Sequence, residues 1–296
     1  VIYNFDPTFI SAVPPRDGGY AQPITREYVE SFVTEVAHRG VDAFLCCPSM
    51  LRRQLWLSKI DAHWEDEAPN LEEPPNPYNW EWDEKIYFRM RRYMLSGVKP
   101  IHELYEASRR EGLKFFFTYR MNDCHYLEKE SSPILDKFWR DHPEFRINDY
   151  GGVHPNMHPQ LVNLLQNYMY PEVRQHYLQI LEELLVNFDV DGLEMDLMRK
   201  PCFVPLPQVE EGREVMTGFV RDVRNLLDRY GAERGKELPL CVRVPHTVQS
   251  CYDVAMDIVR WDAEELIQMV NVSTSFLTNM FALDIRGFRE ELKNAR

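Results

Sequence analysis

The sequence lacks the short motifs by which several enzyme classes are recognised. It has no C-x-x-C pair, no G-x-G-x-x-G or Walker-type phosphate loop, and no G-x-S-x-G elbow. These are the sequence signatures of zinc ribbons, nucleotide-binding α/β domains and serine hydrolases. No apolar run approaches the roughly 20 residues of a membrane helix. We therefore expect no metal, no cofactor and no membrane partner.

Positive charge is scarce. The chain has 34 Lys and Arg residues against 47 Asp and Glu residues, for a formal net charge of −13. Nucleic acids and anionic membrane surfaces bind through basic patches, so this balance argues against both as main partners. Sugars remain compatible with it.

Cysteines are few, and their spacing does not indicate a disulfide framework. In a chain of this size, free and mostly buried thiols are the expected state, which slightly favours a reducing, cytoplasmic compartment. A leader removed before Val1 would also fit the sequence. The six cysteines are Cys46, Cys47, Cys124, Cys202, Cys241 and Cys251.

Short β-branched and aromatic runs alternate with amphipathic helices along the chain. The runs that predict strands are 2–6, 41–47, 113–120, 190–196, 238–244 and 269–275. The segments that predict helices are 24–39, 101–111, 172–188, 214–230, 262–268 and 285–294. Such alternation implies parallel strands joined by right-handed crossovers.

Two folds fit this order: an open doubly wound sheet and a closed barrel. No glycine-rich phosphate loop follows the first strand, so we predict an α/β fold of the parallel (β/α)8 TIM-barrel type. Only six β/α units can be identified in the sequence. The last units of an eightfold barrel would then lie beyond Arg296. We expect residues 1–296 to form a single barrel domain.

A long insertion rich in proline, tryptophan and acidic residues follows the second strand, at about 51–83. Loops of this length are uncommon in compact domains and usually have a function. In a barrel this one would stand on the catalytic face. We expect Trp80 and Trp82 to bind sugar rings through their flat faces, with packing inside the loop as the alternative.

Polar side chains recur at the C-terminal ends of the predicted strands. Because side chains alternate along a strand, Glu194 and Asp196 share one face, while Leu193 and Met195 share the other. A purely structural barrel interior would be filled by Val, Ile and Leu. The recurrence therefore predicts a site centred on Asp196, in which Arg120, Asn122 and Arg243 contact the substrate. A helix-capping or salt-bridged carboxylate is the alternative for Asp196. The other pairs with this parity are Asn4 and Asp6, Arg120 and Asn122, Cys241 and Arg243, and Asn271 and Ser273.

Further candidates lie in the loops that follow these strands. Asp123 and His125 follow the third strand, and His246 follows the fifth. Each histidine is either a substrate contact or an ordinary loop residue. Arg199, just beyond Asp196, either steers substrate or pairs with that carboxylate.

Glu194 and Arg243 are expected at a similar level on neighbouring strands. We therefore predict a buried ion pair between them, with a catalytic carboxyl group as the alternative role of Glu194.

The run VDGLEMDLMR at 190–199 resembles the fourth-strand signature of glycosyl-hydrolase-like TIM barrels, in particular the uncharacterised "family 10-like" group. YNFD at 3–6, RMNDCH at 120–125 and DIVRWDAEELIQMVNVS at 257–273 are similar to the same group. The fourth-strand run is also similar to α-galactosidase-type barrels, in which an Asp ending this strand attacks the anomeric carbon. The resemblance implies that role for Asp196. It assigns no acid/base partner, because no carboxylate ends the fifth or sixth strand here.

We predict a glycoside hydrolase that acts on an oligo- or polysaccharide. Glycosidases usually need two carboxyl groups, roughly 5–5.5 Å apart in retaining enzymes and 6.5–9.5 Å apart in inverting ones. Glu194 and Asp196 stack along one strand, so Asp6, Asp123 or an acid from the loop that holds Trp64 and Glu65 is a better partner for Asp196. An acid from the last strands of the barrel is an equal alternative. Two alternatives stay open: a non-catalytic carbohydrate-binding barrel, and a barrel lyase or aldolase, for which no lysine is well placed.

Overall fold

The structure is a computed structural model that describes residues 1–12, 23–68, 81–153, 158–274 and 283–295. The chain divides into two compact units. The first comprises Val1–Thr118 and Lys129–Arg140, and the second comprises Tyr119–Glu128 and Asp141–Arg296. Each unit is described by itself below.

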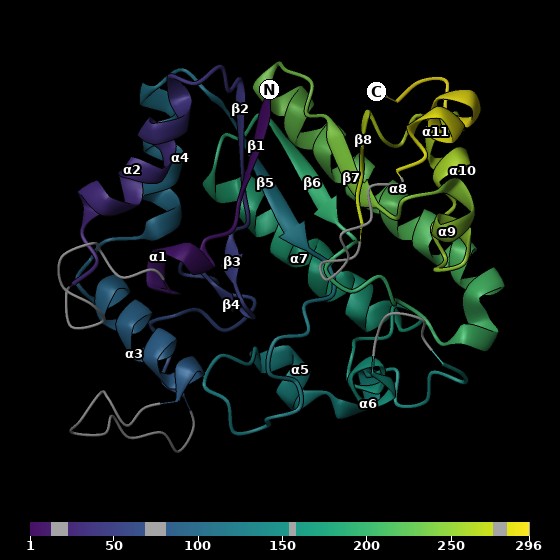
Figure 1. The fold of residues 1–296 in the computed structure, drawn as a ribbon, viewed down its shortest axis with the longest axis horizontal. Coiled ribbons are helices and arrows are strands. Elements are labelled where there is room, and N and C mark those ends of the chain that lie inside the picture. Colours follow the sequence, from purple (N-terminus) through teal and green to yellow (C-terminus); the bar gives the residue numbers. More distant parts are fainter. Residues whose placement is uncertain (13–22, 69–80, 154–157, 275–282, 296) are drawn as a thin grey trace. The chain divides into compact units, whose positions relative to one another are not determined.

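The main sheet has six strands in the order β1-β2-β5-β6-β7-β8 (Figure 1). Neighbours β1 and β2, β2 and β5, β6 and β7, and β7 and β8 pair in parallel. Parallel strands that alternate with helices form part of a (β/α)8 barrel, which confirms the predicted fold class. The strands are β1 (Ile2–Phe5), β2 (Ala43–Cys46), β5 (Lys114–Arg120), β6 (Gly192–Asp196), β7 (Leu240–Val244) and β8 (Met269–Val272).

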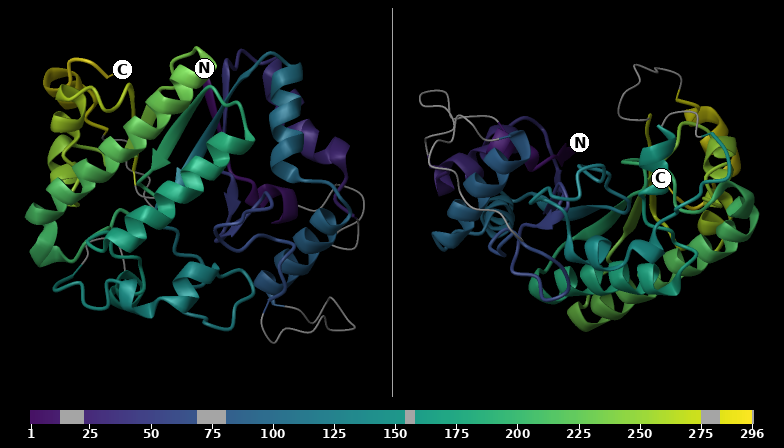
Figure 2. Two further views of the ribbon diagram at one scale, coloured as in Figure 1. Left: turned by 180° about the vertical axis from the view of Figure 1, so that it is seen from behind. Right: turned by 90° about the horizontal axis from the view of Figure 1, so that it is seen from below.

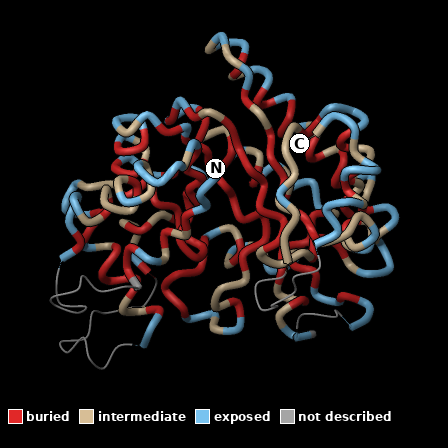
Figure 3. The backbone as a smooth tube through the Cα atoms, turned by 45° about the horizontal axis from the view of Figure 1, so that its top comes forward, coloured by how far each residue is buried: buried red, intermediate tan, exposed pale blue. Residues whose placement is uncertain are grey.

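Every predicted strand is present, and each is shorter than the run that predicted it. The residues that complete these runs join the strands to the neighbouring turns. Buried residues, red in Figure 3, make up most of β2, β5, β6 and β7, whereas β1 and β8 are more exposed.

The first unit contains α1 (Thr8–Ala12), α2 (Arg26–Ala37), α3 (Trp82–Leu95) and α4 (Pro100–Arg110). Thr25 caps α2 by accepting a hydrogen bond from Tyr28 N–H at 3.2 Å, and α2 and α4 pack together. Helix α3 was not predicted. Its buried face carries Arg89 beside Ile86 and Met90, so a charged residue interrupts the apolar stripe.

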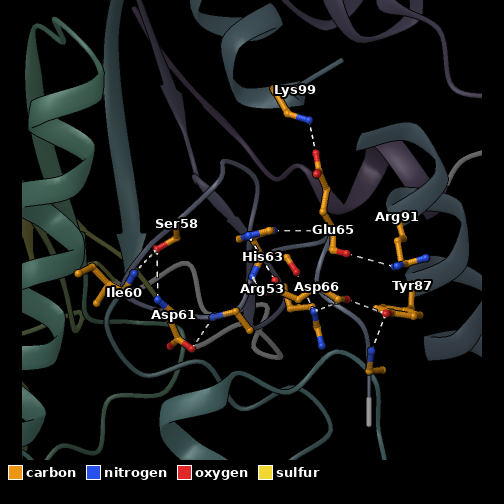
Figure 4. Close-up of polar contacts among 12 residues, drawn as sticks. Arg53, Ser58, Ile60, Asp61, His63, Glu65, Asp66, Tyr87, Arg91 and Lys99 are labelled. Carbon is orange, nitrogen blue, oxygen red and sulfur yellow. Dashed lines mark hydrogen bonds and ion pairs between the residues drawn. The ribbon is translucent and has the colours of Figure 1, made fainter. Parts of the chain in front are cut away.

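The insertion is built around Arg53, which is buried (Figure 4). Its guanidinium donates to the carbonyls of Pro133 at 2.6 Å, His63 at 2.7 Å and Asp66 at 3.2 Å. It also lies over the Tyr87 ring, 5.1 Å from the centroid. Burial lowers the pKa of Arg53 to about 10, so the side chain remains a cation at neutral pH. The hydrogen bonds of the Arg53 side chain thus hold several turns of the insertion in place.

The strands at the start of the insertion, β3 (Ser49–Met50) and β4 (Arg53–Gln54), form a small antiparallel pair. Trp56 and Trp64 are buried and pack inside the insertion. Trp82 is 40% exposed at the first turn of α3. Trp80 lies outside the described residues. The sugar-binding role of Trp80 and Trp82 therefore stays a prediction.

The second unit is covered by α7 (Pro171–Asn187) and α8 (Val209–Arg234), which lie side by side (Figures 1 and 2). Pro171 begins α7 at a position where its missing N–H costs nothing. Helix α8 ends at Gly235, whose φ of 66° lies in the left-handed region that favours glycine. The smaller helices include α6 (Pro159–Asn163), α9 (Val248–Tyr252), α10 (Ile258–Ala263) and α11 (Ile285–Glu291).

Helix α10 begins earlier than the predicted 262–268 segment, because Asp257 caps it by accepting from Arg260 N–H at 3.2 Å. Asp262, near its end, binds the segment that follows α11. Its carboxylate accepts from the backbone N–H groups of Lys293 at 2.7 Å, Asn294 at 3.1 Å and Ala295 at 2.5 Å. This carboxylate replaces the backbone partners that the segment would otherwise lack.

All six cysteines are free thiols. No helix of the described chain is both long and apolar enough to cross a membrane. Within the same described ranges, no group of three or more His, Cys, Asp or Glu is arranged to hold a metal ion.

Candidate functional site

Glu194 lies in the deeper tier of polar side chains between β6, β7 and β8. It is fully buried, and its Oε2 accepts from Asn271 Nδ2 at 3.3 Å and from the Cys241 thiol at 3.4 Å. Burial and the adjacent Glu194 carboxylate raise the pKa of Cys241 well above its usual range, so this thiol stays protonated and donates. The three side chains confirm the predicted parity of their strands.

Asp196 lies in the next tier, at the C-terminal end of β6. Its Oδ1 accepts from Met198 N–H at 2.9 Å, and its Oδ2 lies 3.3 Å from Arg243 Nη1. Arg243 also donates to Ser273 Oγ, through Nε at 3.1 Å and Nη2 at 2.9 Å. Both carboxylate oxygens of this buried aspartate are therefore held by fixed donors.

The predicted ion pair between Glu194 and Arg243 is wrong, because Arg243 pairs with Asp196 instead. The register of the two strands explains the difference. Asp196 is opposite Arg243, and Glu194 is opposite Cys241. Sequence spacing identified the shared face but not the offset between the strands.

The loop after β5 adds a charged cluster around Asp123. This buried carboxylate accepts from the backbone and the Nδ1 of His125 through Oδ1, and Arg120 Nη1 lies 3.5 Å from Oδ2. Arg199 of the loop after β6 donates to His125 Nε2. Burial opposes the charge on Asp123, but His125, Arg120 and Arg199 together hold the pKa of its carboxyl well below the usual range. Asp123 is therefore a permanent anion at neutral pH.

The donation from Arg199 fixes the form of the His125 ring. A nitrogen that accepts a hydrogen bond carries no proton, so Nε2 is the bare nitrogen and Nδ1–H faces Asp123. The imidazole thus lies between the Asp123 carboxylate and the Arg199 guanidinium.

Asn122 joins three chain segments. Its Nδ2 donates to the carbonyls of Gln166 at 3.1 Å and Cys202 at 2.8 Å, and its Oδ1 accepts from Gln166 N–H at 3.3 Å. The amide thus satisfies buried backbone groups, and its expected substrate contact stays a prediction.

The loops after β5 and β6 lie together at one end of their strands. Met121 N–H donates to the Asp196 carbonyl at 3.0 Å, and Tyr168 donates its hydroxyl proton to the Met121 carbonyl. Hydrogen bonds within the second unit bring two groups of predicted site residues together: Arg120, Asp123, His125 and Arg199 in one, and Asp196 and Arg243 in the other.

Two other predicted residues make different contacts. His246 follows β7, where its carbonyl accepts from Asp284 N–H at 3.0 Å. Asp6 belongs to the first unit, where its Oδ1 accepts from Thr8 N–H at 2.9 Å. Gln166 and Tyr168 could not be identified as site residues from the sequence, because both belong to a loop that has no regular sequence pattern.

No protein-family model matches the chain, and no curated protein matches it. Three solved structures with partial similarity are carbohydrate-active enzymes. Alpha-L-fucosidase isoenzyme 2 from Paenibacillus thiaminolyticus shares 12% identity over 94% of this chain and 41% of that one, with a TM-score of 0.49. The alpha-amylase from Geobacillus thermoleovorans shares 14% identity over 82% of this chain and 46% of that one, with a TM-score of 0.43. A glycoside hydrolase family 18 N-acetylglucosaminidase from Paenibacillus barengoltzii shares 13% identity over 60% of this chain and 40% of that one, with a TM-score of 0.34. This chain thus spans less than half the length of each.

Proposed function

We propose that the chain carries the catalytic barrel of a glycoside hydrolase, with Asp196 as the carboxylate that acts at the anomeric carbon. The observation that carries the proposal is the position of Asp196, buried at the C-terminal end of β6 with both oxygens held by fixed donors. Barrel enzymes place their catalytic residues at this end of the strands. The resemblance of residues 190–199 to glycosyl-hydrolase-like barrels supports the same role.

The contacts of Asp196 suit a carboxylate that must keep one orientation. Met198 N–H and Arg243 hold one oxygen each. A carboxylate fixed in this way can attack the anomeric carbon or stabilise the oxocarbenium-like transition state. No side-chain reorganisation is then needed during the reaction.

The general acid is a different group from Asp123 and Glu194. Asp123 stays ionised, because its neighbours hold its pKa well below the usual range, and an acid catalyst must carry a proton at the working pH. Glu194 is fully buried in the deeper tier. Asp6 is the remaining member of the predicted set, and it belongs to the first unit.

Mechanism-based labelling tests the proposal. The protein is incubated with a panel of 2-deoxy-2-fluoro glycosides that carry activated leaving groups, and its intact mass is measured. A retaining hydrolase gains the mass of one fluorosugar, which peptide mapping should place on Asp196. With a substrate found by that panel, Asp196→Asn should lower kcat/KM by more than about a thousandfold.

Asp228→Asn is the matched control, because that aspartate is 65% exposed on α8. It should be labelled at the same rate as the parent. An adduct on another residue, or turnover by Asp196→Asn within a few-fold of the parent, would remove Asp196 from the mechanism.

A second candidate function is carbohydrate binding without turnover. The permanent charge on Asp123 and the complete burial of Glu194 favour it, because neither group then serves as the acid. Such a protein would bind saccharides and release no product, and Asp196→Asn would leave its affinity within a few-fold of the parent.

A further inference from the structure

The acidic and basic side chains at the ends of β5, β6 and β7 differ in how deeply they are buried. The three carboxylates, Glu194, Asp196 and Asp123, are all buried. Two of the basic side chains extend further outwards: that of Arg243 is 31% exposed and that of His125 is 20% exposed. A ligand at these strand ends would therefore meet basic groups before acidic ones.

Arg199 and Lys200 continue this pattern in the loop after β6. Both are partly exposed, whereas the preceding residues of the loop are buried and apolar. Arg199 also contacts His125, which places its guanidinium between the loops after β5 and β6. The basic groups thus come from three separate elements and share one end of the sheet.

Arg243 keeps donors for a ligand. A guanidinium has five N–H bonds. Three N–H groups of Arg243 donate hydrogen bonds to described residues, two to Ser273 and one to Asp196. Two further N–H groups, one on each terminal nitrogen, have no hydrogen-bond acceptor among the described residues, and the side chain is 31% exposed.

The side chains that these contacts connect carry more positive than negative charge. Among the described residues of the two groups, the guanidinium groups of Arg120, Arg199 and Arg243 accompany the carboxylates of Asp123 and Asp196. Glu194 would balance the count, but it lies in the deeper tier, where it binds Asn271 and Cys241. This local excess contrasts with the net charge of −13 for the whole chain.

We propose that the site binds an anionic saccharide, whose carboxylate or sulfate groups contact Arg243 and Arg199. The inference rests on the proposed carbohydrate function and names its substrate class. Guanidinium groups match carboxylate and sulfate oxygens through paired N–H donors. The overall negative charge repels polyanions, so any preference for an acidic sugar must come from these local groups.

Affinity electrophoresis with matched polysaccharides tests the inference. The parent protein is run in gels that contain polygalacturonate or its methyl ester, carboxymethyl- or hydroxyethyl-cellulose, and heparin or its desulfated, N-acetylated form. The first two pairs test carboxylates, and the third tests sulfates. At least one acidic member should bind with a Kd about tenfold or more below that of its matched partner, the scale of one charge-assisted hydrogen bond.

Substitutions locate the effect. Arg199→Gln and Arg243→Gln should each remove most of the preference for the acidic member. Arg229→Gln, on an exposed arginine of α8 that pairs with Glu182, should retain it. Increasing the salt concentration should weaken binding of the acidic member more than that of its partner.

The outcomes separate this inference from the proposed function. Equal or tighter binding of the less charged partners overturns the anionic preference, while a fluorosugar adduct on Asp196 would still support the hydrolase. Acidic binding without any adduct or product would support the preference and favour the binding protein. Absence of binding to every polysaccharide overturns the anionic-saccharide inference.

Discussion

Asp196 and Arg243 stand opposite each other on neighbouring parallel strands, and Oδ2 of the aspartate lies 3.3 Å from Nη1 of the arginine. The pair is only partly shielded, because the arginine side chain is 31% exposed. Its contribution to stability should therefore be small, and its main effect is to fix the carboxylate.

A pair of double-mutant cycles should separate Arg243 from Glu194. Glu194→Gln and Arg243→Met should have additive effects on the free energy of unfolding, because the two side chains do not pair. Asp196→Asn and Arg243→Met should instead show a coupling energy of up to about 1 kcal/mol. Urea melts of the five variants and the parent measure both values. A larger coupling for the Glu194 cycle than for the Asp196 cycle would contradict the assigned partner.

Asp123→Asn should make stability depend less on pH. The folded pKa of Asp123 is depressed, so its charge stabilises the fold above the unfolded pKa of about 3.9, and this contribution is lost as the pH falls further towards the folded pKa. Loss of one partner from a buried charged cluster costs roughly 3–5 kcal/mol. Urea melts should therefore show a large deficit at pH 7 that shrinks at pH 3. A deficit of equal size at both values would mean that packing, and not charge, is responsible.

Two tryptophans of the insertion should respond in opposite ways. Trp64→Ala should lower the free energy of unfolding by about 3–5 kcal/mol, because this ring is completely buried. Trp82 is 40% exposed, so Trp82→Ala should leave stability nearly unchanged and raise KM more than it lowers kcat. Thermal melts and steady-state kinetics provide the comparison. An unchanged KM together with a lower melting temperature would make Trp82 a packing residue as well.

Asn122→Ala should destabilise the second unit by about 2–3 kcal/mol or more, because it removes the partners of buried backbone groups at Gln166 and Cys202. Asn187→Ala is the control, since the Asn187 amide donates to the Glu183 carbonyl at an exposed helix end. Denaturant melts should show a change below about 0.5 kcal/mol for the control. Similar changes in the free energy of unfolding for both variants would mean that the hydrogen bonds of Asn122 do not stabilise the second unit.

The sequence predicted the strands and their inward faces well, because both depend on local alternation. The parity that placed Glu194 with Asp196 also placed Cys241 with Arg243, and the contacts agree. The pairing offset between β6 and β7 depends on the whole sheet, so the partner of Arg243 could not be derived from spacing. The same limit applies to His125 and Arg199, whose contact joins two loops far apart in the sequence.

Helix α3 and the start of α10 were harder to predict for a different reason. Their signals are single polar residues: a buried Arg89 within an apolar stripe, and Asp257 as a cap. Each has an equally plausible reading as a loop residue when the neighbouring elements are unknown.

The hydrogen bonds of Arg53 influence which residue types the insertion can contain. The hydrogen bonds of this side chain go to main-chain carbonyls at Pro133, His63 and Asp66, and none of them depends on the side chain that the acceptor residue carries. The backbone path of the insertion is thereby constrained, while the residue types at its acceptor positions are left open. An insertion held in this way can exchange the side chains at its acceptor positions and keep the same backbone path.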